Sequence, residues 1–104
     1  MTKTCTENNI DRLARVMKIL SEPNRLSILC SMGLECTPVS AIIEATGLSQ
    51  TNVSFHLRIM REAGLVKGER RGSFIYYCLY DTTLLALLDD MNQWLDKSLQ
   101  KAVG

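Results

Sequence analysis

The chain has 104 residues, a length that allows one domain and excludes a catalytic barrel or a two-domain enzyme. Its hydrophobic fraction of 46% and charged fraction of 22% are close to those of soluble globular proteins, which excludes wholesale disorder. The formal net charge is only +1, so the overall balance does not indicate a polyanionic partner. No apolar run approaches the ~20 residues of a membrane span, and the first residues lack the apolar stretch of a secretory signal. We therefore expect a cytoplasmic protein without membrane contact.

Helical periodicity dominates the first two thirds of the chain. Apolar residues recur at helical spacing over residues 7–20, which predicts an amphipathic helix. Proline in the first turn and glycine after the last turn are typical helix boundaries. These signals predict three further helices: one over 23–33, one that Thr37 and Pro38 open and Gly47 ends, and one over 49–64 with Ser49 as N-cap. A short turn containing glycine joins the last two, so residues 38–63 form a helix-turn-helix.

The composition changes after Gly64. β-branched and aromatic residues are concentrated in 74–80 and follow a break at 71–73, which predicts a β-hairpin over 65–80. From Asp81, a suitable N-cap, apolar residues repeat at spacings of three and four in a last helix over 82–100. The expected fold is mainly α, with five helices and a small β-hairpin.

The apolar stripe of the last helix continues for about four turns, longer than a small domain needs for its own core. We therefore expect the first and last helices to form a dimerisation surface, and the alternative is that they only cover the core of the monomer. The residues expected at this interface are the apolar positions of the two helices: Ile10, Leu13, Met17, Leu84, Leu88, Met91 and Leu95.

The fourth helix has two different faces. On a helical wheel Val53, Leu57 and Met60 fall in one narrow sector, which predicts that they pack inward. The opposite face is rich in hydroxyls, amides and a guanidinium, groups that hydrogen-bond base edges and phosphates in a DNA major groove. Phe55 on this face either contacts thymine methyl groups or packs under the hairpin. The candidate DNA-contacting residues of this segment are Ser49, Gln50, Thr51, Asn52, Ser54, Phe55 and Arg58.

Positive charge is concentrated at the hairpin. Lys67, Arg70 and Arg71 lie around Gly68 and Gly72, where mobile cations can straddle a phosphate backbone or enter a minor groove. A charged turn is usually only solvated. Because this one directly follows a helix-turn-helix, we expect it to contact nucleic acid.

The chain resembles the ArsR/SmtB family of dimeric winged-helix repressors. The resemblance is carried, in order and spacing, by SEPNRLSIL (21–29), GLSQTNVSFHLRIMREAGLV (47–66) and ERRGSFIYYCL (69–79), and the family pattern of five helices plus wing covers nearly the whole chain. It implies one winged helix-turn-helix domain over 1–104, with a recognition helix at 49–63.

By the same resemblance, residues 65–80 are the wing. The resemblance implies a homodimer that binds a palindromic double-stranded DNA operator, represses transcription and releases the DNA when an inducer binds. His56 occupies a position at which such proteins commonly carry a histidine. We include it among the candidate DNA-contacting residues and interpret its role as structural or close to the DNA.

The positions of the histidine and the cysteines indicate which class of inducer the protein could sense. Residues 82–104 contain no histidine, so a zinc, cobalt or nickel site in the last helix is not expected. Arsenic and cadmium sensors of the family often carry a cysteine pair at the start of the third helix, where this chain has only Cys36. Cys5 of the N-terminal arm could reach Cys36 of the other subunit. With Cys30 they would supply three thiolates for a soft metal or metalloid such as As(III), Cd(II) or Pb(II).

Two other interpretations of the cysteines stay open. The surroundings of Cys30, RLSILCSM, resemble the second helix of the family's sulfur and redox sensors, which oxidise this cysteine against one in the last helix. The last helix here has none, so Cys36 or Cys5 would have to substitute. Alternatively Cys30 only packs on the apolar face of its helix. Cys78, in the middle of a strand, is interpreted as packing.

No enzyme is expected, and no organic cofactor. The single His56 has no thiol or carboxylate partner implied by spacing, and no glycine-rich phosphate loop is present. The alternative from another class is a winged-helix module that binds a protein through its apolar last helix. Salt separates the two classes, since DNA binding through several phosphates weakens steeply with salt and an apolar protein interface does not.

Overall fold

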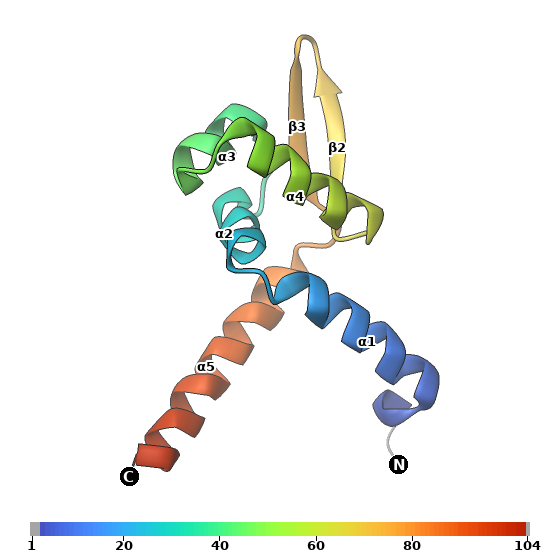
Figure 1. Cartoon of the computed structure of the whole chain (residues 1–104), viewed down its shortest axis with the longest axis vertical. Coiled ribbons are helices and arrows are strands. Elements are labelled where there is room, and N and C mark those ends of the chain that lie inside the picture. Colours follow the sequence, from blue (N-terminus) through green and yellow to red (C-terminus); the bar gives the residue numbers. More distant parts are fainter. Residues whose placement is uncertain (1–2, 104) are drawn as a thin grey trace.

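The structure is a computed structural model that describes residues 3–103. Within these residues the fold consists of one short 3-10 helix, five α-helices and a three-stranded antiparallel sheet, which confirms the mainly helical winged architecture. In chain order they are η1 (Lys3–Cys5, a 3-10 turn), α1 (Glu7–Leu20), α2 (Pro23–Met32), β1 (Thr37–Pro38), α3 (Val39–Thr46), α4 (Gln50–Glu62), β2 (Val66–Arg71), β3 (Phe74–Leu79) and α5 (Thr83–Val103). The β2–β3 hairpin projects at one end, and α1 and α5 diverge toward the other end, where both termini lie (Figure 1).

Local side-chain chemistry sets the helix ends. Pro23 occupies the first turn of α2, and Gly47 ends α3 in the left-handed conformation at φ 72°. The Ser49 hydroxyl accepts the backbone N–H of Asn52 at 3.1 Å and caps α4. Before α5, hydrogen bonds from the Thr83 backbone N–H and hydroxyl hold the pKa of the Asp81 carboxyl below its usual value.

The core lies between α2, α3, α4 and the base of the wing. Val53, Leu57 and Met60 are fully buried in it, which confirms the inward face expected for α4. Hydrophobic burial at these positions fixes α4 so that its opposite face stays exposed. The core cluster consists of Ile28, Leu29, Met32, Ile42, Val53, Leu57, Met60, Val66 and Leu79.

Strand β1 was not expected from the sequence. Thr37 and Pro38 do not open a helix; they pair with β3, opposite Tyr77 and Tyr76, at one edge of a sheet ordered β1-β3-β2. Proline fits an edge strand because it has no N–H to donate, and its ψ of 147° is extended. Helix α3 therefore begins only at Val39.

The chain is more open than a compact domain of its length. Its radius of gyration is 15.7 Å, whereas a compact domain of this size has about 13 Å. It exposes 7624 Å², against about 5,900 Å² for an average folded monomer of this mass. Helix α1 contains no buried residue. None of the helices in the described part of the chain is long and apolar enough to cross a membrane.

Candidate nucleic-acid interface

The outer face of α4 carries exposed polar side chains. Gln50, Thr51, Ser54 and Arg58 are all exposed on the side away from the core. Gln50 and Ser54 also line an open groove of about 270 Å³ together with Ser73 of the wing turn. The start of α4 and the wing tip thus form one continuous surface.

Phe55 lies on the same exposed side. Its side chain is 47% exposed, and its ring stands edge-on to the imidazole of His56 with the ring centres 5.3 Å apart. The hairpin does not enclose Phe55, so a large part of this aromatic surface is free to contact a ligand.

His56 belongs to the interior, which corrects its inclusion among the DNA-contacting residues. Only 8% of its surface is exposed. Its Nδ1 accepts a hydrogen bond from Nε of Arg25 at 3.2 Å, and the same guanidinium donates to the backbone carbonyl of Ile19 at 3.0 Å. His56 therefore ties α4 to α2 and to the end of α1, in agreement with its structural interpretation.

Replacing His56 with alanine should lower the free energy of unfolding by about 1–3 kcal/mol, because the half-buried Arg25 guanidinium loses its acceptor. Urea denaturation of the variant would measure this. The neighbouring exposed Ser54→Ala variant is the control and should change stability by less than about 0.5 kcal/mol. Equal stabilities for the two variants would show that the Arg25–His56 contact contributes nothing.

Aromatic rings hold two of the wing cations. The Arg71 guanidinium lies 4.5 Å from the centre of the Tyr76 ring, and Nζ of Lys67 lies 5.9 Å from that of Tyr80. Arg71 also pairs with Glu69 at 3.2 Å, and both side chains are about half exposed. Arg70 is exposed as well. Arg70 and Arg71 therefore lie exposed beside the turn of the β2–β3 hairpin, which projects at one end of the molecule (Figure 1). Lys67 is also exposed, but it lies opposite Cys78 near the base of the hairpin and not at the charged turn where the sequence placed it.

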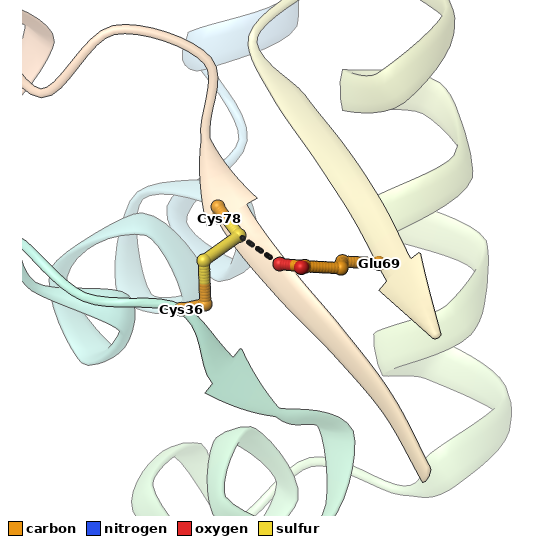
Figure 2. A group of neighbouring side chains, drawn as sticks. All are labelled: Cys36, Glu69 and Cys78. Atoms are coloured by element: carbon orange, nitrogen blue, oxygen red, sulfur yellow. Dashed lines mark hydrogen bonds between the residues drawn. A yellow bond between two sulfur atoms is a disulfide. The ribbon is translucent and has the colours of Figure 1, made fainter. Parts of the chain in front are cut away.

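Two cysteines meet beside the wing. Figure 2 shows a disulfide between Cys36, which precedes β1, and Cys78 on β3, with Cα atoms 4.3 Å apart. Glu69 of β2 points at this pair, and its Oε2 lies 3.8 Å from Sγ of Cys78. The three potential ligand atoms lie within 4.8 Å of one another. The chain thus contains a cysteine site that could hold a metal ion if the disulfide were reduced.

This arrangement differs from the expected cysteine chemistry. Cys78 does not merely pack, since its sulfur is bonded to Cys36. Within one chain Cys36 is joined to neither Cys5 nor Cys30, which are both free and exposed. Sequence periodicity could not find the pair, because it depends on the pairing of β1 with β3. Glu69 was not expected at a cysteine site either, because the sequence shows it only as one charged residue of the hairpin. The structure adds it as a third candidate ligand.

Cys30 is not buried, contrary to its interpretation as a packing residue. It lies at an open, mostly apolar cavity of about 390 Å³ between α1, α2 and α5. The cavity is lined by Met17, Leu20, Ser21, Leu26, Cys30, Leu88, Met91, Asn92 and Leu95.

The interface residues expected on α1 and α5 divide into two groups. Leu84 and Leu88 are half-buried and pack against the chain's own core. The others are exposed by 41–54%: Ile10, Leu13, Met17, Met91 and Leu95. Leu87 and Trp94, which were not expected there, are exposed by 62% and 63%. The apolar surface of α5 is therefore broader than a single stripe.

Comparison with known proteins decides the family. The family model of bacterial regulatory proteins of the arsR family matches residues 22–67. The transcriptional repressor SdpR of Bacillus subtilis (strain 168) is 32% identical over 82 residues, which span 79% of this chain and 91% of that protein. The chain belongs to the ArsR family.

Other relatives agree with this assignment. The transcriptional regulator NmtR of Mycobacterium tuberculosis is 42% identical to this ArsR-family chain over 79 residues, which span 76% of the chain and 66% of NmtR. The solution structure of the homodimeric winged helix-turn-helix DNA-binding domain of Mb0332 from Mycobacterium bovis has a TM-score of 0.78 and 29% identity, covering 97% of this chain and 93% of that one. This ArsR-family protein is therefore a winged-helix transcriptional regulator and not an enzyme, as its sequence predicts.

Proposed function

We propose that this ArsR-family regulator is a homodimeric repressor that binds a palindromic DNA operator and releases it when a thiol-reactive inducer binds. The observation that carries the proposal is the shared surface of α4 and the wing, where Gln50 and Ser54 line one groove with Ser73. Exposed hydrogen-bonding groups beside projecting cations suit a major groove flanked by phosphates. We expect this to take place in the cytoplasm.

The homodimer is supported by uncovered apolar surface. The excess of exposed area over an average monomer is of the order that one partner buries in a stable dimer. Mb0332, which shares this fold, is homodimeric. In a symmetric dimer the two α4 helices can enter successive major grooves about 34 Å apart.

We expect the side chains of α4 and those of the wing to contact different parts of the DNA. We expect the exposed residues of α4 to read base edges or bind adjacent phosphates, and the wing cations to bind phosphates on either side. These residues are Ser49, Gln50, Thr51, Asn52, Ser54, Phe55 and Arg58 on or capping α4, and Lys67, Arg70 and Arg71 on the wing.

Arg58→Ala should reduce the preference for the operator over a scrambled duplex by about 1–3 kcal/mol, because a bidentate guanidinium contact discriminates between bases. Competition binding with the two duplexes measures this. Arg15→Ala removes the same charge from exposed α1 and should leave the preference unchanged. An unchanged preference in Arg58→Ala would remove Arg58 from base recognition.

The inducer is proposed to act on cysteine, as a soft metal or metalloid such as Cd(II) or arsenite. A second candidate, a redox or persulfide signal at Cys30, is favoured by the exposure of that thiol beside the cavity between α1, α2 and α5. DNA release from the reduced protein, compared for As(III), Cd(II), Zn(II), peroxide and a persulfide donor, separates these classes. Cys30→Ser should abolish the response only if Cys30 is the sensor.

A further inference from the structure

We propose that Cys36, Cys78 and Glu69, after reduction of the disulfide, bind one soft divalent metal ion, and that the bound ion weakens operator binding. Only the second part of this proposal rests on the proposed function. The site joins all three strands of the sheet, since Cys36 directly precedes β1, Cys78 lies on β3 and Glu69 on β2.

The sheet holds the two sulfurs together even without the bond between them. Strands β1 and β3 are antiparallel, and Thr37 lies opposite Tyr77. The residue before Thr37 therefore lies opposite the residue after Tyr77, which places Cys36 beside Cys78 with Cα atoms 4.3 Å apart. Ligands at bond lengths of about 2.3 Å around a tetrahedral ion are separated by about 3.8 Å. Because the Glu69 carboxylate is already 3.8 Å from the Cys78 sulfur, side-chain rotations alone can complete such a site.

The donor set indicates the class of ion. Two thiolates select soft or borderline metals, and a carboxylate is a common third ligand of zinc-like ions. A dithiol reductant supplies two electrons and two protons, which convert the disulfide to two thiols while the reductant becomes a disulfide. The ion then replaces both thiol protons, which pass to solvent. Glu69 is half exposed, so a hydrated ion can reach the site.

The site is connected to the proposed DNA surface through Glu69. Its carboxylate now pairs with Arg71 at 3.2 Å, while Arg71 lies over the Tyr76 ring. A metal ion bound to Glu69 competes with Arg71 for that carboxylate and changes the position of a wing cation. On the other side, Cys36 precedes β1 and α3, so the same ion fixes the wing to the entry of the helix-turn-helix. An ion that binds better to this arrangement than to the DNA-bound one acts as an inducer.

The site is tested by titrating the full chain, reduced and then freed of reductant under anaerobic conditions, with Cd(II). Thiolate-to-cadmium absorption should saturate at one ion per chain. Cys36→Ser and Cys78→Ser should each lose this signal, and Glu69→Gln should weaken binding about tenfold, whereas Cys30→Ser, the matched control, should bind as the wild type does. The oxidised wild type needs no substitution and should lose the saturating one-per-chain site, since only the exposed free thiols of Cys5 and Cys30 remain. A saturating one-per-chain signal that survives in both Cys36→Ser and Cys78→Ser, or in the oxidised chain, overturns the site.

The regulatory part is tested by operator binding of the reduced wild type with and without Cd(II). We expect Cd(II) to weaken operator affinity about tenfold, and linkage requires the operator to weaken Cd(II) binding by the same factor. The Cys36→Ser variant should bind the operator with the same affinity in the presence and absence of Cd(II). If Cd(II) binds and operator affinity is unchanged, the inducer role is wrong. If the metal-free protein binds no DNA, the proposed function fails while the Cd(II) titration still decides the site.

Discussion

Replacing both Met91 and Leu95 with lysine should prevent dimerisation and weaken operator binding by about 100-fold or more. A dimer binds both half-sites of the operator at once, whereas a monomer binds only one and loses the added affinity of the second contact. The two residues are one helical turn apart on α5 and are 48% and 41% exposed in the single chain. In a dimer that covers this face they would be buried, and unpaired ammonium groups there are strongly unfavourable. Sedimentation should report a monomer, and fluorescence anisotropy with a labelled operator should report the loss.

The control for this variant is Gln93→Lys, which adds a cation at an exposed position of α5. It should leave both dimerisation and operator affinity close to those of the wild type. Circular dichroism of the double variant should still show the helical content of a folded chain, since neither side chain belongs to the core cluster. A monomer that binds the operator as tightly as the wild type would show that pairing is not required.

Replacing Arg70 and Arg71 together with alanine should weaken binding to every duplex, by on the order of tenfold or more at moderate salt. Contacts of this kind release counterions, so the slope of log affinity against log salt should become less steep by about 2, roughly 0.9 for each lost phosphate contact. The preference between operator and scrambled sequence should change little, because phosphate contacts carry no base information. A salt series with both duplexes measures all three quantities.

A matched control removes two charges elsewhere. Arg12 and Arg15 lie exposed on α1, and their double alanine variant has the same net charge as the wing variant. It should retain the salt slope of the wild type. An unaltered slope in the wing variant would mean that the wing does not touch phosphate. Binding that hardly responds to salt in any variant would favour an apolar protein partner instead of DNA.

The helical part of the fold and the two faces of α4 can be predicted from the amino-acid sequence alone. Helix spacing, proline and glycine boundaries and the Ser49 cap are local properties, and the structure places α1 at Glu7–Leu20 and α4 at Gln50–Glu62, as expected. The burial of Val53 and Leu57 followed from the period of 3.6 residues, since one side of an amphipathic helix must be removed from water.

Contacts between segments that are distant in the chain become visible only in the folded molecule. The pairing of β1 with β3 joins Cys36 to Cys78 across a sequence separation of 42, and β2 brings Glu69 beside them. His56 became an interior residue because Arg25 of α2 approaches it. Strand register and contacts between helices depend on the packing of the whole core. Local periodicity contains no information on which strand lies opposite another, so these contacts could not be found from the sequence alone.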